Sequence, residues 1–512
     1  MPHRRRALTL ARLLIAVLCA ALWAVLLSVP AAAQELDLVL AGGRVIDPAS
    51  GLDAVRHVGI RDGRVVALSE APLGGREVVD AGGLVVAPGF IDLHAHGQDA
   101  GSNRLQAADG VTTALELEIG VWPVGAWLES RRGNAVIHYG ATAGHLPARV
   151  KLMHGVDAGH TSLPTEAARA AMREIGPSPD YSHRAAGEEE IESLAGLLER
   201  GLDEGGLGLG LGITYTPAAT HAEILRVFEV AAARGVPVFV HLRANQSFAD
   251  RSAVGPFQEV IADAAATGAS LHVVHLNSTA DEEARICLEM IRGARERGLD
   301  VTTESYPYTA GSTRLESALF DGWHETSGGR YDQLQWIATG ERLTRETFDR
   351  YRAQGGWVII HGRSEETMEW IVAQPDVMVA SDGIPFVDGL SHPRGAGTFS
   401  RILGHYARER GVLTLMDALA KMTIHPARRL EAVAPAMARK GRIEVGGDAD
   451  LTVFDPETVL DRATYEAPAQ PSTGIVHVLV AGTFVVRDGA VVEGVHPGQP
   501  VVGRSAGSGD AE

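Results

Sequence analysis

The sequence predicts an α/β fold, a TIM-type (β/α)8 barrel joined to a small β-sandwich that both ends of the chain build. The central part, residues 88–435, alternates continuous apolar runs with helical segments, as parallel strands covered by helices do. Residues 36–86 and about 440–500 instead show short alternating strands separated by turns. Each terminal segment alone would leave one sheet face exposed, so we expect the two to pack together.

Eight apolar runs of the central part are interpreted as barrel strands, because they alternate with helical segments along the chain. They are Phe90–His94, Val111–Glu118, Ala135–Tyr139, Leu207–Tyr215, Val236–His241, Ser270–His275, Val301–Ser305 and Val377–Asp382. The stretch from about Thr309 to Gly362 is too long for a simple crossover and contains a strand-like piece, Trp357–His361. We therefore predict an insertion there, near the mouth of the barrel. The sandwich comprises residues 34–87 and 436–501, and a disordered tail is expected at 502–512.

The first 33 residues have the features of an export signal. Three arginines at positions 4–6 precede an apolar stretch, Leu13–Val29, and Ala31-Ala32-Ala33 before Gln34 resembles a small-residue cleavage site. A membrane anchor is the alternative, because the apolar run approaches the ~17 residues that a span requires. The cleavage site favours removal, so we expect a periplasmic or secreted protein without a stable membrane anchor.

Composition narrows the classes of partner. The formal net charge is −18, and loss of the four arginines and no acids in residues 1–33 would make it −22. Such a charge disfavours nucleic acid and anionic membranes, so a small-molecule substrate is the expected partner. Cys19 would leave with the signal and Cys287 would have no intrachain partner, so no disulfide is expected. The oligomeric state stays open, with a homo-oligomer among the options.

Metal-competent residues recur at the carboxyl ends of the predicted strands, where TIM barrels place their active sites. His94 and His96 close the first strand, and their spacing of two puts both rings on one face. Glu116 and Glu118 close the second strand, again on a shared face. Two glutamates ending an apolar strand are costly unless paired or ligated. Of the two, Glu118 is the preferred ligand because it lies nearer the mouth.

Three further strand ends complete the candidate site. His241 and His275 end strands that lie about one βα unit apart, so both are expected to reach the mouth of the barrel. His272 is expected to be an ordinary packed or hydrogen-bonded histidine. Asp382 ends the eighth strand, where it could exchange a proton with an attacking water.

The sequence resembles the amidohydrolase superfamily and, within it, the D-aminoacylase or N-acyl-D-amino-acid deacylase group. The resemblance covers nearly all of the chain after residue 33 and is carried by several motifs. These are Pro88-Gly89-Phe90-Ile91-Asp92-Leu93-His94-Ala95-His96, the glycine-rich stretch Gly206–Tyr215 with Thr216-Pro217, Tyr306-Pro307-Tyr308-Thr309-Ala310-Gly311-Ser312-Thr313, Ser381-Asp382-Gly383 with His392-Pro393-Arg394 and Gly397-Thr398-Phe399, and Thr423-Ile424-His425-Pro426-Ala427.

The resemblance implies a zinc enzyme with one or two ions that hydrolyses a linear amide in an N-acylated, D-configured amino acid. The implied ligands are His94, His96, His241, His275 and Asp382. The position of Glu118 at the end of the second strand adds it to this set. Asp382 would also act as general acid and base. Tyr306, Ser312 and Arg394 would hold the substrate carboxylate, a role that suits the planar fork of arginine.

Two positions depart from the pattern of this group. D-aminoacylases usually present a cysteine after the second strand, where this chain has Glu118, and the harder carboxylate admits a two-metal centre or another metal. They often carry lysine two residues beyond the second isolated histidine, where this chain has Asn277. Arg243 is the candidate that would replace the lost charge.

Two other functions stay open from the sequence. A hydantoinase- or dihydroorotase-like cyclic-amide hydrolase shares the barrel but commonly uses a carboxylated lysine. Lys151, beyond the third strand, is a poor candidate for that residue. An inactive barrel that serves as a binding scaffold is the other alternative, although such barrels typically lose metal ligands.

Overall fold

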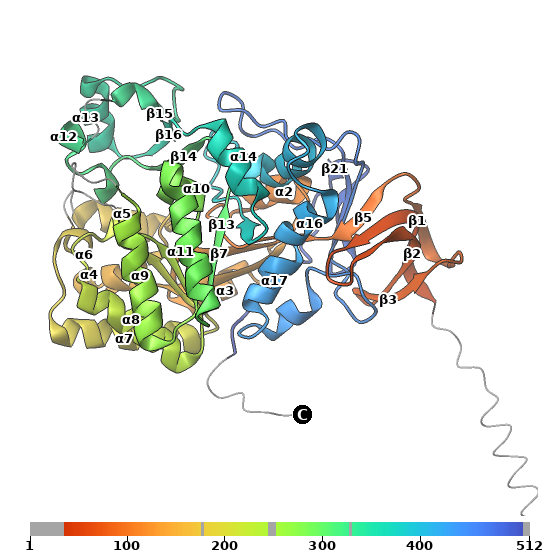
Figure 1. Ribbon diagram of the computed structural model, residues 1–512, viewed down its shortest axis with the longest axis horizontal. Coiled ribbons are helices and arrows are strands. Elements are labelled where there is room, and N and C mark those ends of the chain that lie inside the picture. Colours follow the sequence, from red (N-terminus) through yellow and green to blue (C-terminus); the bar gives the residue numbers. More distant parts are fainter. Residues whose placement is uncertain (1–34, 176–178, 244–251, 327–329, 505–512) are drawn as a thin grey trace, which may run out of the picture.

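A computed structural model of the chain describes residues 35–175, 179–243, 252–326 and 330–504. The predicted export signal and most of the predicted tail therefore lie outside the described residues. Within them the chain forms a large α/β body, a sheet domain at one end and a small subdomain above the barrel (Figure 1). None of the described helices is long and apolar enough to cross a membrane.

Eight parallel strands form the TIM-type barrel, as the sequence predicts. They are almost entirely buried, and all twelve residues of the second strand lie inside. The ring closes where Ala95, after the first strand, bridges Gly383, after the last. The strands are β6 (Phe90–Asp92), β7 (Val111–Trp122), β8 (His138–Gly144), β10 (Leu209–Gly212), β11 (Val238–His241), β12 (Leu271–Val273), β13 (Val301–Ser305) and β17 (Val377–Val379).

Helices cover the outside of the barrel and connect successive strands. A typical one begins where the Thr220 side chain accepts from the Glu223 amide and ends at Gly235 in the left-handed conformation. They are α2 (Ala100–Ala108), α3 (Val124–Arg131), α4 (His145–His154), α5 (Glu166–Ile175), α6 (Asp180–His183), α7 (Glu188–Asp203), α8 (His221–Arg234), α9 (Val254–Thr267), α10 (Leu276–Ala280), α11 (Ala284–Glu296), α14 (Glu365–Ala373), α15 (Arg394–Arg401), α16 (Leu415–Met422) and α17 (Ile424–Leu430). A two-residue strand, β9 (Gly159–His160), also pairs with β7.

The two chain ends join in one nine-stranded sheet. Antiparallel pairing of Val86 with Val453 connects the N-terminal to the C-terminal strands. The first strand bends at a bulge between Leu40 and Gly43, so its two halves pair with different neighbours and the sheet folds over a shared apolar core. The strands are β1 (Leu36–Asp47), β2 (Leu52–Arg61), β3 (Arg64–Ser69), β4 (Gly75–Asp80), β5 (Val85–Pro88), β18 (Leu451–Phe454), β19 (Ile475–Val480), β20 (Thr483–Arg487) and β21 (Ala490–Val491).

Between β13 and α14 the chain forms a subdomain with its own sheet. The antiparallel strands run in the order β14-β16-β15 over a core that includes Phe348 and Trp336. The elements are β14 (Ala310–Arg314), α12 (Trp323–Thr326), β15 (Leu334–Trp336), α13 (Arg345–Gln354) and β16 (Trp357–His361). Only residues 306–309 separate its first strand from the end of β13, so the subdomain lies beside the mouth of the barrel.

Several barrel strands are shorter than the sequence predicts, because the backbone leaves the sheet to point side chains across the mouth. The chain turns into a 3-10 helix at Ile213–Tyr215 after β10. It leaves β12 and β17 through His275 (φ 34°) and Asp382 (φ 49°), both in the left-handed region. Residues other than glycine adopt this conformation at a cost, and such strain concentrates at functional sites.

Candidate metal centre

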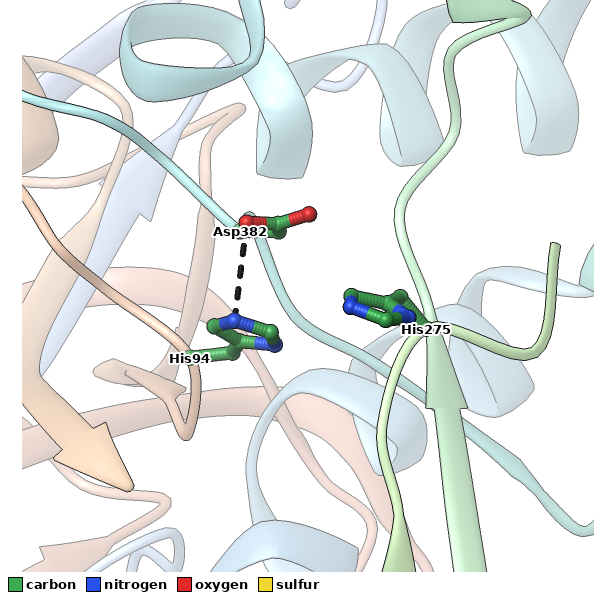
Figure 2. Close-up of side chains that lie close together, drawn as sticks. All are labelled: His94, His275 and Asp382. Atoms are coloured by element: carbon green, nitrogen blue, oxygen red, sulfur yellow. Dashed lines mark ion pairs between the residues drawn. The ribbon is translucent and has the colours of Figure 1, made fainter. Parts of the chain in front are cut away.

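Four histidines and two carboxylates converge at the carboxyl end of the barrel. They are His94, His96, Glu118, His241, His275 and Asp382, the six ligands proposed from the sequence. Figure 2 shows three of them, His94, His275 and Asp382, reaching into a common space from different strand ends. His241 is partly exposed, and the other five are buried.

Glu118 lies between two pairs of histidines and presents one carboxylate oxygen to each. Its Oε2 is 3.2 Å from His94 Nε2 and 3.0 Å from His96 Nε2. Its Oε1 is 2.5 Å from His241 Nδ1 and 3.2 Å from His275 Nε2. Ligand atoms about 2.1 Å from a tetrahedral ion are about 3.4 Å apart, close to most of these separations. The carboxylate is therefore placed to bridge two ions or to complete one site.

Asp382 joins the His94–His96 side of the cluster. Its Oδ1 is 3.5 Å from the Nε2 atoms of both histidines, while its Oδ2 is 2.9 Å from Arg394 Nη1. Burial alone would raise the pKa of Asp382, but the charges of Arg394 and His94 lower it. Asp382 is thus held as a carboxylate with one oxygen toward the histidines.

Carboxylates behind the histidines fix which ring nitrogen faces the centre. His94 Nδ1 lies 2.6 Å from Glu304 Oε1, and His96 Nδ1 lies 2.7 Å from Glu116 Oε2. An ionised carboxylate only accepts, so both Nδ1 atoms donate, and in the neutral rings that a metal would bind the Nε2 lone pairs point inward. Metal-ligating histidines are typically held by such a carboxylate partner.

The site carries more negative charge than neutral histidines can balance. Burial would raise the pKa values of Glu116 and Glu304, but neighbouring histidines lower both to about 2. Burial would lower the pKa of His94, but Asp382, Glu118 and Glu304 raise it well above its ordinary value. Buried carboxylates require compensating charge, and divalent cations among these ligands would provide it.

The other residues proposed from the sequence fall into two groups. Arg394 donates to the Ser312 carbonyl (3.3 Å) and its guanidinium lies 4.6 Å from the centre of the Tyr306 ring, so these three residues lie together beside Asp382. The Ser312 hydroxyl, however, donates to the Val358 carbonyl within the subdomain. Arg243 is not brought to this group. Its guanidinium pairs with Glu259 at 2.8 Å and donates to the Ala219 carbonyl.

Sequence reasoning missed the residues that support the ligands. Glu304 stands one position before the end of a predicted barrel strand, and that position could have marked it as a site residue. His272 lies 3.3 Å from its other carboxylate oxygen. Asp92 accepts from the amides of His94 and Ser381. His160, 2.6 Å from Glu116, comes from the two-residue strand β9, which leaves no periodic signal. Glu116 itself faces this supporting layer, whereas Glu118 faces the ligand cluster.

Comparisons with known proteins show the family to which the chain belongs. A family model described as "Amidohydrolase family" matches residues 77–486. N-acyl-D-glutamate deacylase of Alcaligenes xylosoxydans xylosoxydans is 34% identical over 484 residues, 88% of this chain and 94% of the relative.

Two solved structures share the fold over 92% of this chain and all of theirs. One is N-acyl-D-glutamate deacylase from Bordetella bronchiseptica, complexed with zinc and a phosphonate that mimics the tetrahedral intermediate (TM-score 0.75, 27% identity). The other is a D-aminoacylase described by its binuclear metal centre, with activation by one metal and attenuation by a second (TM-score 0.74, 25% identity).

Proposed function

Since the chain belongs to the amidohydrolase family, we propose that it is a zinc-dependent deacylase that hydrolyses the linear amide of N-acyl-D-amino acids. The observation that carries this proposal is the placement of Glu118 between two histidine pairs, with Asp382 and Arg394 alongside. The substrate class and its D configuration come from the named relatives, whose metal-bound structures share the fold.

One or two zinc ions fit the ligand set. One position would use His94, His96, Asp382 and Glu118 Oε2, and the other would use His241, His275 and Glu118 Oε1. Bound zinc supplies Lewis acidity and lowers the pKa of water toward ~7. Glu118 would offer one oxygen to each histidine pair, so we propose that this chain can hold two ions.

Asp382 is the residue that would move the proton. Its Oδ1 faces the ligand cluster, from which an attacking water would approach the amide carbonyl. Asp382 accepts the proton of that water as the new C–O bond forms, and then delivers it to the nitrogen as the C–N bond breaks. The products are the carboxylic acid of the acyl group and the free amino acid.

Arg394 would bind the α-carboxylate of the substrate. It is buried, and its Nε has no hydrogen-bond partner among the described residues. The guanidinium lies between Asp382 and the Tyr306 ring, which limits the directions from which a carboxylate can reach it. Ser312 supports Arg394 through its backbone carbonyl, which accepts a hydrogen bond from the guanidinium. Its hydroxyl instead donates to the Val358 carbonyl.

The two alternatives find less support. Lys151, the candidate for a carboxylated lysine, lies on α4 and pairs with Asp157 at 3.0 Å, away from the ligand cluster. A scaffold without activity would not need six converging ligands with supporting carboxylates.

We also propose, from the first 33 residues alone, that the enzyme is exported. The intact mass of the mature protein, expected to begin at Gln34, tests that proposal.

A direct test combines metal analysis with substrate assays. The purified enzyme should contain one to two zinc ions per chain and should hydrolyse N-acetyl-D-amino acids but neither their L forms nor hydantoins. Glu118→Cys should retain metal and activity, because thiolate is the residue that D-aminoacylases usually present there, whereas Glu118→Ala should lose both. Hydantoin hydrolysis without deacylation, or full activity after chelation, would overturn the proposal.

A further inference from the structure

We propose that Arg363, Tyr306 and Gly311 form a second anion subsite, which binds a carboxylate on the substrate side chain. The proposal rests on the deacylase function above and deepens it, because it names N-acylated dicarboxylic amino acids as the preferred substrates. It also identifies a cation that can replace the lysine charge that is absent at Asn277.

The first observation is that three donors converge on a glycine. Arg363 follows β16, and its amide donates to the Thr309 carbonyl (3.2 Å), which holds it beside the start of β14. A β-carbon at Gly311 would lie 3.0 Å from Tyr306 Oη and 3.2 and 3.3 Å from Arg363 Nη1 and Nη2. Glycine therefore lets these donors approach the backbone more closely than a β-carbon would allow.

The second observation is that the donors lack acceptors. Tyr306 Oη and Arg363 Nη1 are buried and have no hydrogen-bond partner among the described residues. No acidic side chain of the described chain lies within ion-pair distance of Arg363; Asp281 is near enough for the arginine charge to oppose the rise that burial causes in its pKa. Arg363 as a whole is only partly buried, but a buried guanidinium nitrogen without an acceptor is costly, and a carboxylate matches the planar fork of arginine.

The third observation is that the two arginines lie at different parts of one tyrosine. Arg394 lies over the face of the Tyr306 ring and pairs with Asp382, whereas Arg363 and the phenol oxygen of Tyr306 both approach Gly311. A substrate with its α-carboxylate at Arg394 would therefore direct a further carboxylate to Arg363. Arg243, the cation that the sequence suggested, is already paired with Glu259.

The test compares two substrates in the zinc-loaded enzyme. Arg363→Met should lower kcat/KM for N-acetyl-D-glutamate about 10- to 100-fold, mainly through KM, because a charge-assisted hydrogen bond is lost. It should change kcat/KM for N-acetyl-D-leucine less than about threefold. Gly311→Ala, whose β-carbon would displace the donors, should produce the same selective loss. Arg350→Met is the matched control, because Arg350 is an exposed arginine on α13 of the same subdomain.

Each outcome has a defined meaning. An equal loss for both substrates, or no loss for the dicarboxylic one, overturns the subsite while leaving the deacylase function in place. If the wild type hydrolyses neither substrate, the proposed function fails, and the subsite is then tested by glutarate binding. Glutarate should raise the thermal midpoint of the wild type and not that of Arg363→Met, and equal shifts would overturn the subsite as well.

Discussion

The two ends of the barrel both bury histidine beside carboxylate, yet they differ in how completely these groups are paired. At the amino end, His138 at the start of β8 contacts Asp450 at 3.0 Å and accepts from the Gln499 amide. Asp450 also accepts from Lys440 at 2.5 Å and from the Ala481 amide. Each of these polar atoms has a partner within the chain, so the cluster fastens the terminal sheet to the barrel.

At the carboxyl end, the histidine nitrogens face one another and Glu118 without enough protons to satisfy them all. Carboxylates outnumber the fixed cations, and Arg394 is the guanidinium that contacts the cluster. The comparison shows that a buried histidine–carboxylate contact is not by itself a functional signal. The excess of ligand atoms over partners distinguishes the candidate metal centre from the structural cluster.

The largest expected effect comes from Asp382→Asn, which removes a proton acceptor at the carboxyl end. We expect kcat to fall about 10²- to 10⁴-fold, the usual contribution of a positioned general base, with a much smaller change in KM. Circular dichroism should show an unchanged fold. Turnover within threefold of the wild type would contradict the role of Asp382.

Asp450→Asn, at the amino end, should lower stability and leave activity nearly unchanged. Loss of the carboxylate leaves Lys440 and His138 without their buried partner, so we expect a loss of about 3 kcal/mol in stability. Asp448, 3.0 Å from Lys440, offsets part of the lost charge. Thermal unfolding measures the loss, and activity per folded molecule should stay within twofold of the wild type. A large drop in specific activity would show that the two ends are not independent.

Glu304→Gln tests the layer behind the ligands. The amide keeps a hydrogen bond to His94 but removes the negative charge that favours the inward-facing lone pair. Zinc affinity should fall about 10- to 100-fold, the usual cost of losing such a partner. Competition with a chelator of known affinity measures it, and His272→Gln, which contacts only the other oxygen of Glu304, should have a smaller effect.

The smallest effect concerns acid stability. Burial would raise the pKa of Asp450, but His138 and Lys440 lower it well below its ordinary value. A depressed acid pKa stabilises the fold above the unfolded value of ~3.9 and loses that contribution as pH falls below it. The difference in thermal midpoint between wild type and Asp450→Asn should therefore be constant near neutral pH and shrink below about pH 4. A difference that grows on acidification would contradict this linkage.

The barrel could be predicted from the sequence, and so could the convergence of the six candidate ligands, because both follow local rules; their role as ligands stays a prediction. Buried parallel strands appear as continuous apolar runs, and ligands at strand ends follow those runs directly, as His241 and Asp382 do. The preference for Glu118 over Glu116 as a ligand stays a prediction: Glu118 lies between the two histidine pairs, whereas Glu116 lies behind His96.

The supporting residues could not be predicted, because their contacts depend on packing between distant segments. His160 reaches Glu116 only through the short strand β9, and Arg363 approaches Gly311 only because β16 folds back along β14. Arg243 is a residue that the sequence placed in the substrate site and that packing places elsewhere. Its spacing from His241 suggested a place in the substrate site, but α9 supplies Glu259 as a partner that no strand pattern reveals.

The closure of the barrel has a consequence for how the enzyme matures. The seam joins the first and last strands through the Ala95–Gly383 bridge, and Ser381 donates to Asp92 across 289 positions of the chain. His94 and His96 lie on one side of this seam and Asp382 on the other. A nascent chain therefore cannot present the full ligand set until residue 383 has been synthesised and docked. The group of His94, His96 and Asp382 is therefore completed only at the final stage of folding, in whichever compartment the barrel closes.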